Sequence, residues 1–215
     1  MNKFLALGWT VLLATSVLGQ GPLTGQPAGR FGPLASQRRL DVKEWGAKGD
    51  GITDDSTAVQ RAVTYSMGTA NNAYGSKPAL YFGPGTYLLH DIVLPPYVSV
   101  IGDGANTTTL KINPAYPNSD LLVFDGIVYN TCGAGYPNCY PEVRSLTLAG
   151  CGHTCVGILL ELDAISQARV TDVNFYNHGG FGLKTNDSER GRFMGNTFNA
   201  IAFPIAMTGD ANESY

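Results

Sequence analysis

The stretch Val143–Ile205 reads VRSLTLAGCGHTCVGILLELDAISQARVTDVNFYNHGGFGLKTNDSERGRFMGNTFNAIAFPI, and it contains an internal repeat. Strand-like triplets recur along it, and so does a second set of apolar pairs. The triplets and the pairs recur at a nearly constant spacing, and the runs between them are short and β-type. Such a spacing indicates a solenoid, in which each repeat forms one coil that stacks in parallel on the next. An antiparallel β-sandwich with accidental periodicity is the alternative. The triplets are Leu146-Thr-Leu148, Val173-Asn-Phe175 and Asn196-Thr-Phe198, and the pairs are Ile158/Leu160, Phe181/Leu183 and Phe203/Ile205.

The cysteines mark an insertion in this repeat. The first two triplets lie further apart than the first two pairs, so the extra residues fall between Leu148 and Ile158, where Cys151 and Cys155 occur. An even number of cysteines in an exported chain favours disulfides, and four cysteines allow three pairings. The favoured pairs each close a short glycine-containing loop. A zinc site is the alternative, but the first pair is spaced more widely than zinc ligands usually are, so no metal site is expected. The favoured pairs are Cys132–Cys139 and Cys151–Cys155.

Upstream of the repeat, the sequence predicts one helix and more short strands. Thr53-Asp54-Asp55-Ser56 are N-cap residue types. Thr57 and Gln60 have the spacing of a capping box, and apolar residues then recur at helical intervals, which predicts a helix over Asp55–Met67. The β-type runs that follow lie too close together for β-α-β units. They cover residues 79–82, 86–89, 92–94, 98–101, 109–112 and 121–124.

Two motifs resemble a known family. DVKEWGAKGDGITDDSTAVQRAV (Asp41–Val63) resembles the opening motif of the pectate-lyase superfamily group that includes rhamnogalacturonase, epimerase-like and exo-β-1,3-glucanase proteins, with Trp45 in place of Phe or Tyr. LYFGPGTYLLHDIVLPPYVSVIGDGANTTTL (Leu80–Leu110) resembles the segment that follows, with Gly83 where Pro is common. The resemblance implies an all-β fold, a single-stranded right-handed parallel β-helix over residues 41–215, with the helix capping its N-terminal end.

The residues of the first motif are expected to be structural. The glycines would allow turns with positive φ, and the aspartates would cap the helix. Asp54 and Asp55 could instead form a glycosidase pair, but neighbours in sequence seldom span the ~5–9 Å across a scissile bond. The residues assigned to this structural motif are Gly46, Gly49, Asp50, Gly51, Asp54, Asp55 and Gln60.

The N-terminus predicts export. Lys3 precedes the apolar run Phe4–Leu18, which is shorter than the ~20 residues of a membrane span and is followed by small residues. We expect a signal peptide over residues 1–19, a flexible leader over 20–40, a secreted product and no membrane contact after cleavage; a short membrane anchor is the alternative. Glycosylation sequons begin at Asn106, Asn186 and Asn212.

The composition excludes several classes of protein. Charged residues make up 14% of the chain, against a usual ~25%, and long helical patterns are missing, which argues against bundles and coiled coils. A net charge of −3 gives no electrostatic footprint for nucleic acid.

No complete catalytic motif occurs, but four residues are candidates. His178, in Asn177-His-Gly-Gly180, is predicted on a loop after a coil strand, where β-helices bind ligands. Asp172, Asp187 and Glu189 lie near Arg190 and Arg192 and could be brought together by neighbouring coils. The alternative for His178 is a loop histidine without a functional role. The alternative for the three acids is that they are solvated surface residues.

The resemblance implies a secreted carbohydrate-active protein, most simply a glycoside hydrolase acting on a cell-wall polysaccharide, although the sequence leaves open whether it is an enzyme. A polysaccharide lyase, which would use calcium, and a non-catalytic glycan-binding or adhesive surface protein are the alternatives. No other cofactor is expected. The partner would be a polysaccharide or glycan, and the full-length protein would be a monomer. Because no cap follows the last strand, we expect a C-terminally truncated chain.

Overall fold

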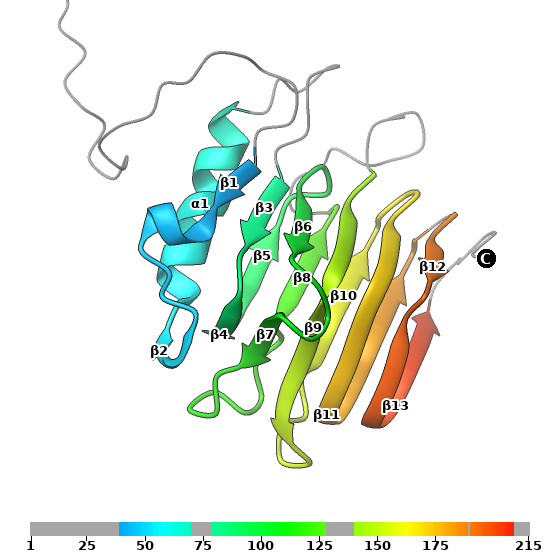
Figure 1. The fold of residues 1–215 in the computed structure, drawn as a ribbon. Coiled ribbons are helices and arrows are strands. Elements are labelled where there is room, and N and C mark those ends of the chain that lie inside the picture. The colour runs from blue at the N-terminus through cyan, green and yellow to red at the C-terminus, as the bar shows by residue number, and fades with distance from the viewer. Residues whose placement is uncertain (1–38, 70–78, 128–139, 189, 209–215) are drawn as a thin grey trace, which may run out of the picture.

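The computed structural model describes residues 39–69, 79–127, 140–188 and 190–208, which form one parallel β-helix (Figure 1). A 3-10 helix, η1 (Val42–Trp45), and α1 (Ser56–Thr69) lie at its N-terminal end. The strands are β1 (Arg39–Asp41), β2 (Asp50–Asp54), β3 (Ala79–Phe82), β4 (Gly85–Leu89), β5 (Ile92–Leu94), β6 (Ser99–Gly102), β7 (Thr108–Ile112), β8 (Leu122–Asp125), β9 (Glu142–Gly152), β10 (Ile158–Asp163), β11 (Arg169–Asn186), β12 (Arg192–Met194) and β13 (Thr197–Thr208).

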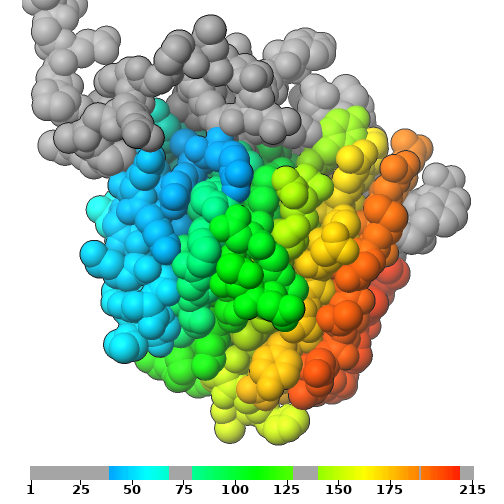
Figure 2. All heavy atoms as spheres, viewed as in Figure 1, coloured from blue at the N-terminus to red at the C-terminus, as the bar shows by residue number. Residues whose placement is uncertain are grey.

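All strand pairings in the described residues are parallel, and their register confirms the repeat predicted from the sequence. Leu148 pairs with Phe175 and Phe175 with Phe198, while Ile158 pairs with Phe181 and Phe181 with Phe203. The coils appear as successive bands in the space-filling view (Figure 2). The β-sandwich alternative is therefore wrong.

The pairings define three faces, and the core lies between them. The first face contains β1, β3, β6 and β12, the second β2, β4 and β7, and the third β5, β8 and β10; β9 and β11 bend from one face to the next, as β13 does after β12. Apolar side chains stack inward in columns, such as Leu122, Leu160 and Leu183, which are all fully buried. Their burial provides the main free energy that holds the coils together.

Residues with a left-handed backbone stack at the corners of the coils. Asp172 (φ 54°) lies between Ser145 (φ 57°) and Gly195 (φ 67°) in the register of neighbouring coils. Asp187 (φ 46°) follows Ala164 (φ 51°) in the same way at another corner. Asp is one of the few non-glycine residues that adopt this conformation readily, so these acids have a backbone role in turning the chain.

The N-terminal cap agrees with the sequence in part. Asp54 Oδ1 accepts a hydrogen bond from the Ser56 amide, 2.9 Å away, so Asp54 caps α1 as predicted. The carboxylate of Asp55 turns away from the helix and accepts from the amides of Lys48 and Gly49, at 2.6 and 3.0 Å. Asp55 therefore closes the glycine-rich turn that precedes the helix.

The turns of the first motif have the predicted conformation. Gly46, Gly49 and Gly51 all have positive φ, at 103°, 63° and 73°. The carboxylate of Asp50 accepts from the amides of Thr53 and Ile52, and these bonds lower its pKa to about 2.

The capping-box prediction for Gln60 is wrong. Its side-chain amide donates to the Val93 carbonyl and accepts from the Val93 amide, both at 3.3 Å. The side chain of Gln60 thus makes the two hydrogen bonds that a residue of a neighbouring strand would make with Val93. Gln60 therefore joins α1 to β5, and the tertiary contact outweighs the local capping pattern.

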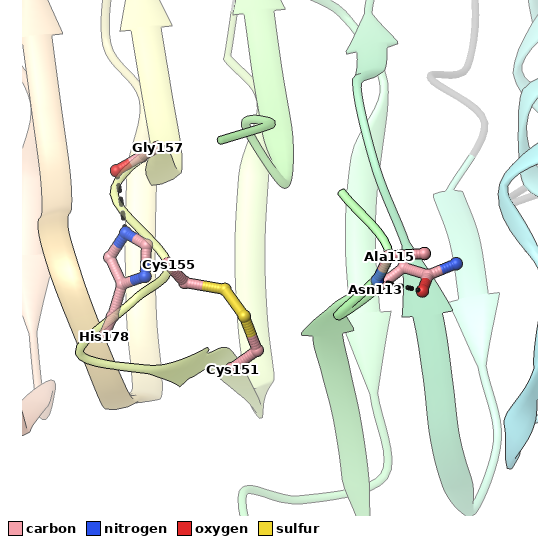
Figure 3. Close-up of a disulfide and its surroundings, with 6 residues drawn as sticks. All are labelled: Asn113, Ala115, Cys151, Cys155, Gly157 and His178. Carbon is pink, nitrogen blue, oxygen red and sulfur yellow. Dashed lines mark hydrogen bonds between the residues drawn. A yellow bond between two sulfur atoms is a disulfide. The ribbon is translucent and has the colours of Figure 1, made fainter. Parts of the chain in front are cut away.

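A disulfide closes the insertion predicted between the repeats. Cys151 at the end of β9 is joined to Cys155, as expected, and the loop ends before β10 (Figure 3). Cys132 and Cys139 lie outside the described residues. At this point β9 and β11 also change register, between Tyr176 and His178.

Removing this disulfide is expected to weaken the fold modestly. A cross-link around so short a loop contributes at most about 2 kcal/mol through loop-closure entropy, and the flanking strands already hold both ends. We expect the paired variant Cys151→Ser/Cys155→Ser to lose up to that amount in urea unfolding. His153→Ala, an exposed change in the same loop, is the control and should have no measurable effect. A loss well beyond the loop-closure value would show that the loop packing depends on the bond.

Candidate functional site

The structure contradicts the prediction that His178 lies on an exposed loop. His178 belongs to β11 and is fully buried, and its Nε2 donates to the Gly157 carbonyl at 2.7 Å (Figure 3). The glycines that follow it do not open a binding loop. They let the chain pass close under residues 153–157, because a Cβ at Gly179 or Gly180 would collide with backbone atoms there.

The three acidic candidates do not form a common site in the described residues. Asp172 and Asp187 are exposed, but they occupy different corners, beside Ser145 and Ala164 of the preceding coil. Glu189 lies outside the described residues. Asp172 and Asp187 both belong to the coil that β11 forms, at different corners of it, so stacking of one coil on the next cannot bring them side by side.

The sequons differ in accessibility. Asn106 is exposed, whereas the amide of Asn186 donates to Asp163 Oδ1 at 2.8 Å; Asn212 is outside the described residues.

Charged groups gather instead on the outer surface of the third face. In β10, Glu161 lies between the buried Leu160 and Leu162 and therefore points outward. It pairs in register with Lys184 of β11, whose Nζ lies 2.8 Å from Glu161 Oε1. This bond raises the pKa of Lys184 and keeps the amine protonated. Glu161 therefore has a protonated amine directly beside it.

Asp120 lies just before β8 in a different environment. Its Oδ1 accepts from the Ile158 amide at 2.8 Å, and its main-chain carbonyl accepts from the Asp91 amide at 2.7 Å. Burial raises the pKa of Asp120, and the nearby charges of Glu161 and Asp91 raise it further. We call Asp91, Asp120, Glu161 and Lys184 the carboxylate face.

A histidine–tyrosine stack borders the carboxylate face. The rings of His90 and Tyr116 lie 4.0 Å apart at 24°, and Tyr116 is 45% exposed. His90 Nδ1 lies 3.3 Å from Asp91 Oδ2, and its Nε2 lies 3.4 Å from Asp54 Oδ2. An exposed aromatic surface beside carboxylates offers a sugar both an apolar platform and hydrogen-bond acceptors.

The carboxylate face contains the elements of acid–base chemistry. Burial raises the pKa of Asp120, while Glu161 pairs with the amine of Lys184. A carboxyl group with a raised pKa and a second carboxyl group paired with a cation are suited to the acid and base roles of hydrolysis. Glu161 pairs in register with a residue of β8, and Asp120 lies three positions before that residue. Three positions correspond to about 10 Å along a strand. The two carboxyl groups of inverting glycosidases are typically ~6.5–9.5 Å apart.

Sequence reasoning missed these residues because no motif joins them. Asp120 and Glu161 are far apart in the chain, on opposite sides of the disulfide loop, and only the pairing of β8 with β10 brings them near each other. One signal was available, since Lys184 follows Glu161 by one repeat of the coil. No group of three or more His, Cys, Asp and Glu residues suited to a metal ion occurs in the ranges that the structure describes.

The buried His178 is expected to make stability depend on pH. Burial lowers its pKa, against the smaller effect of the Gly157 carbonyl. In the unfolded chain the histidine has its ordinary pKa of ~6.5, so below that pH the folded protein binds fewer protons than the unfolded chain. The free energy of unfolding therefore falls as the pH drops from ~6.5 through the lowered pKa of the folded state. Urea unfolding at about pH 7 and pH 5 should show a smaller loss for His178→Gln than for the native chain. His153→Gln, on the exposed loop, should match the native chain; equal losses in all three proteins would refute the assignment.

Comparison with known proteins identifies relatives of this chain. The family model described as rhamnogalacturonase A/epimerase, pectate lyase-like, matches residues 40–201. A probable glucan endo-1,3-beta-glucosidase of Arthroderma benhamiae is 31% identical over 116 residues, which are 50% of this chain and 13% of that protein. A glucan 1,3-beta-glucosidase of Cochliobolus carbonum is 33% identical over 95 residues, which are 42% of this chain and 12% of that protein. The chain thus spans only about an eighth of the length of these relatives.

Solved structures share the fold at low identity. The surface adhesin PfbA of Streptococcus pneumoniae has a TM-score of 0.55 at 19% identity, over 77% of this chain and 39% of that one. Tailspike protein 3 of bacteriophage CBA120 has a TM-score of 0.51 at 18% identity, over 79% of this chain and 30% of that one. At this level of identity the likeness establishes the fold alone.

Proposed function

The chain belongs to the rhamnogalacturonase A/epimerase, pectate lyase-like family, and on this premise we propose that it is part of a carbohydrate-active protein that hydrolyses a cell-wall polysaccharide. The observation that carries the proposal is the pair Asp120 and Glu161, two neighbouring carboxyl groups of which the first has a raised pKa and the second pairs with Lys184. Two relatives are named as 1,3-β-glucan glucosidases, which makes β-1,3-glucan the first substrate to test.

In this proposal, the side chains have separate roles. Asp120, biased toward the protonated form, donates a proton to the glycosidic oxygen, and Glu161 acts as the base that activates water. Lys184 holds the Glu161 carboxyl in place through the contact between Nζ and Oε1, and the His90–Tyr116 stack provides a platform for a sugar ring. Except for Tyr116, these residues lie in strands or directly beside them. The strands therefore fix the site before substrate binds.

We further propose that the protein is secreted and acts as a monomer when full length. The apolar N-terminal run supports export, and the described residues contain no helix long and apolar enough to cross a membrane.

The test is an assay of the purified chain on β-1,3-glucan, rhamnogalacturonan and pectin. We expect new reducing ends from β-1,3-glucan, without the ultraviolet absorbance of an unsaturated product, and no loss of activity when calcium is chelated. An unsaturated product that requires calcium would identify a lyase instead. Saturable glycan binding without any cleavage would replace the hydrolase proposal with a binding or adhesive function.

A further inference from the structure

We propose that His178 is a positioning residue for Asp120 and acts through a single peptide group, the one between Gly157 and Ile158. The inference rests on the site proposed above, but it concerns a residue that cannot touch a substrate, because His178 is fully buried. It assigns a role to a titratable group that the proposed mechanism does not use.

The connection consists of two hydrogen bonds on opposite ends of one planar unit. His178 Nε2 donates to the Gly157 carbonyl at 2.7 Å, and the Ile158 amide of the same peptide donates to Asp120 Oδ1 at 2.8 Å. Because the peptide is planar and stiff, fixing its carbonyl also fixes the direction of its N–H. The hydrogen bond from that N–H favours the ionised form of Asp120 and so opposes the effect of burial on its pKa.

The surroundings leave this peptide little freedom to move. A Cβ at Gly157 would collide with the Ser119 carbonyl, and one at Gly180 would collide with the Gly157 carbonyl, so the backbone is closely packed on both sides. The Gly157 carbonyl also accepts from the Phe181 amide at 3.2 Å. The disulfide at Cys155 closes the loop two residues before this peptide (Figure 3).

The hydrogen bond fixes the tautomer of the neutral histidine. Its Nε2 faces a carbonyl and must carry the hydrogen, while Nδ1 is buried and has no hydrogen-bond partner among the described residues. A Cβ at Gly150 would lie only 2.5 Å from Nδ1, so the ring is packed against the chain on that side as well. A neutral ring with one fixed donor is suited to orienting a peptide rather than to transferring protons.

The experiment compares His178→Met with His178→Gln. Methionine fills much of the volume but removes the donor, whereas glutamine restores an N–H at about the reach of Nε2. In His178→Met we expect the Ile158 amide to exchange about tenfold faster or more and the pKa of Asp120, measured by carboxyl-carbon NMR, to rise. In His178→Gln we expect both values to return toward those of the native chain.

A role limited to core packing gives a different result. Both variants would then lose stability, and the pKa of Asp120 would stay at its native value in each. That outcome, in folded proteins, overturns the proposal. If His178→Met does not fold, Asp120→Asn provides the reciprocal measurement, since coupling between two sites acts in both directions. We expect Asp120→Asn to shift the Nε2–H resonance of His178, and an unchanged resonance overturns the proposal.

These measurements do not require turnover. Failure of the native chain to cleave any polysaccharide would refute the proposed hydrolase function and leave the coupling between His178 and Asp120 standing. Conversely, a chain that hydrolyses β-1,3-glucan but shows no coupling would refute the positioning role alone.

Discussion

Asp120→Asn is expected to lower the rate of polysaccharide hydrolysis by about a thousandfold, which is within the usual contribution of a general acid. The amide is nearly the same size and can still accept from the Ile158 amide, which the carboxylate does in the native protein. The variant should therefore fold normally. What it lacks is a proton to give to the leaving group, so kcat should fall much more than KM changes.

The corner acid Asp172 provides the matched control. Asp172→Asn makes the same chemical change at an exposed position, and asparagine also tolerates the left-handed backbone that Asp172 adopts. We expect native activity from Asp172→Asn when initial rates are measured beside Asp120→Asn. If Asp172→Asn is the inactive variant and Asp120→Asn is active, the site lies at the corners of the coils and the carboxylate face has no catalytic role.

Gly157→Ala is expected to reduce the free energy of unfolding by about 3 kcal/mol, near the upper end for single substitutions. The added methyl group would collide with the carbonyl of Ser119, which belongs to the backbone of the preceding coil and cannot swing aside. The strain must separate the two coils or rotate the peptide that links His178 to Asp120. Urea unfolding followed by circular dichroism measures the loss.

Gly83→Ala is the control for this substitution. Its added methyl would lie 3.7 Å or more from the Tyr81 side chain, which is ordinary contact, and its backbone does not have a left-handed φ. We expect a change within about 0.5 kcal/mol, because the added methyl group makes only ordinary contacts and breaks no named interaction. A Gly157→Ala protein as stable as the Gly83→Ala protein would mean that the coils separate easily at this point.

The coil architecture was predictable because it repeats along the chain. Stacked strands bury the same side of each coil, so Leu148, Phe175 and Phe198 recur at the period of the solenoid, and the chain carries that period without reference to distant contacts. The insertion at Cys151 was predictable for the same reason, since an extra loop breaks a regular spacing. Asp54 as a helix cap was predictable because capping depends on neighbours within a few residues.

The candidate site was decided by tertiary structure. Gln60 has the local pattern of a capping box, yet its amide pairs with Val93 because that strand lies within reach only after folding. His178 lies beside glycines that look like an exposed loop, yet the neighbouring coil needs those glycines for close packing. Asp120 and Glu161 lie near each other only because β8 and β10 pair in a particular register. A repeat in the sequence determines which residues face inward. Strand register determines which of the remaining groups meet, and burial alters their pKa values. Register and burial both depend on the whole stack of coils.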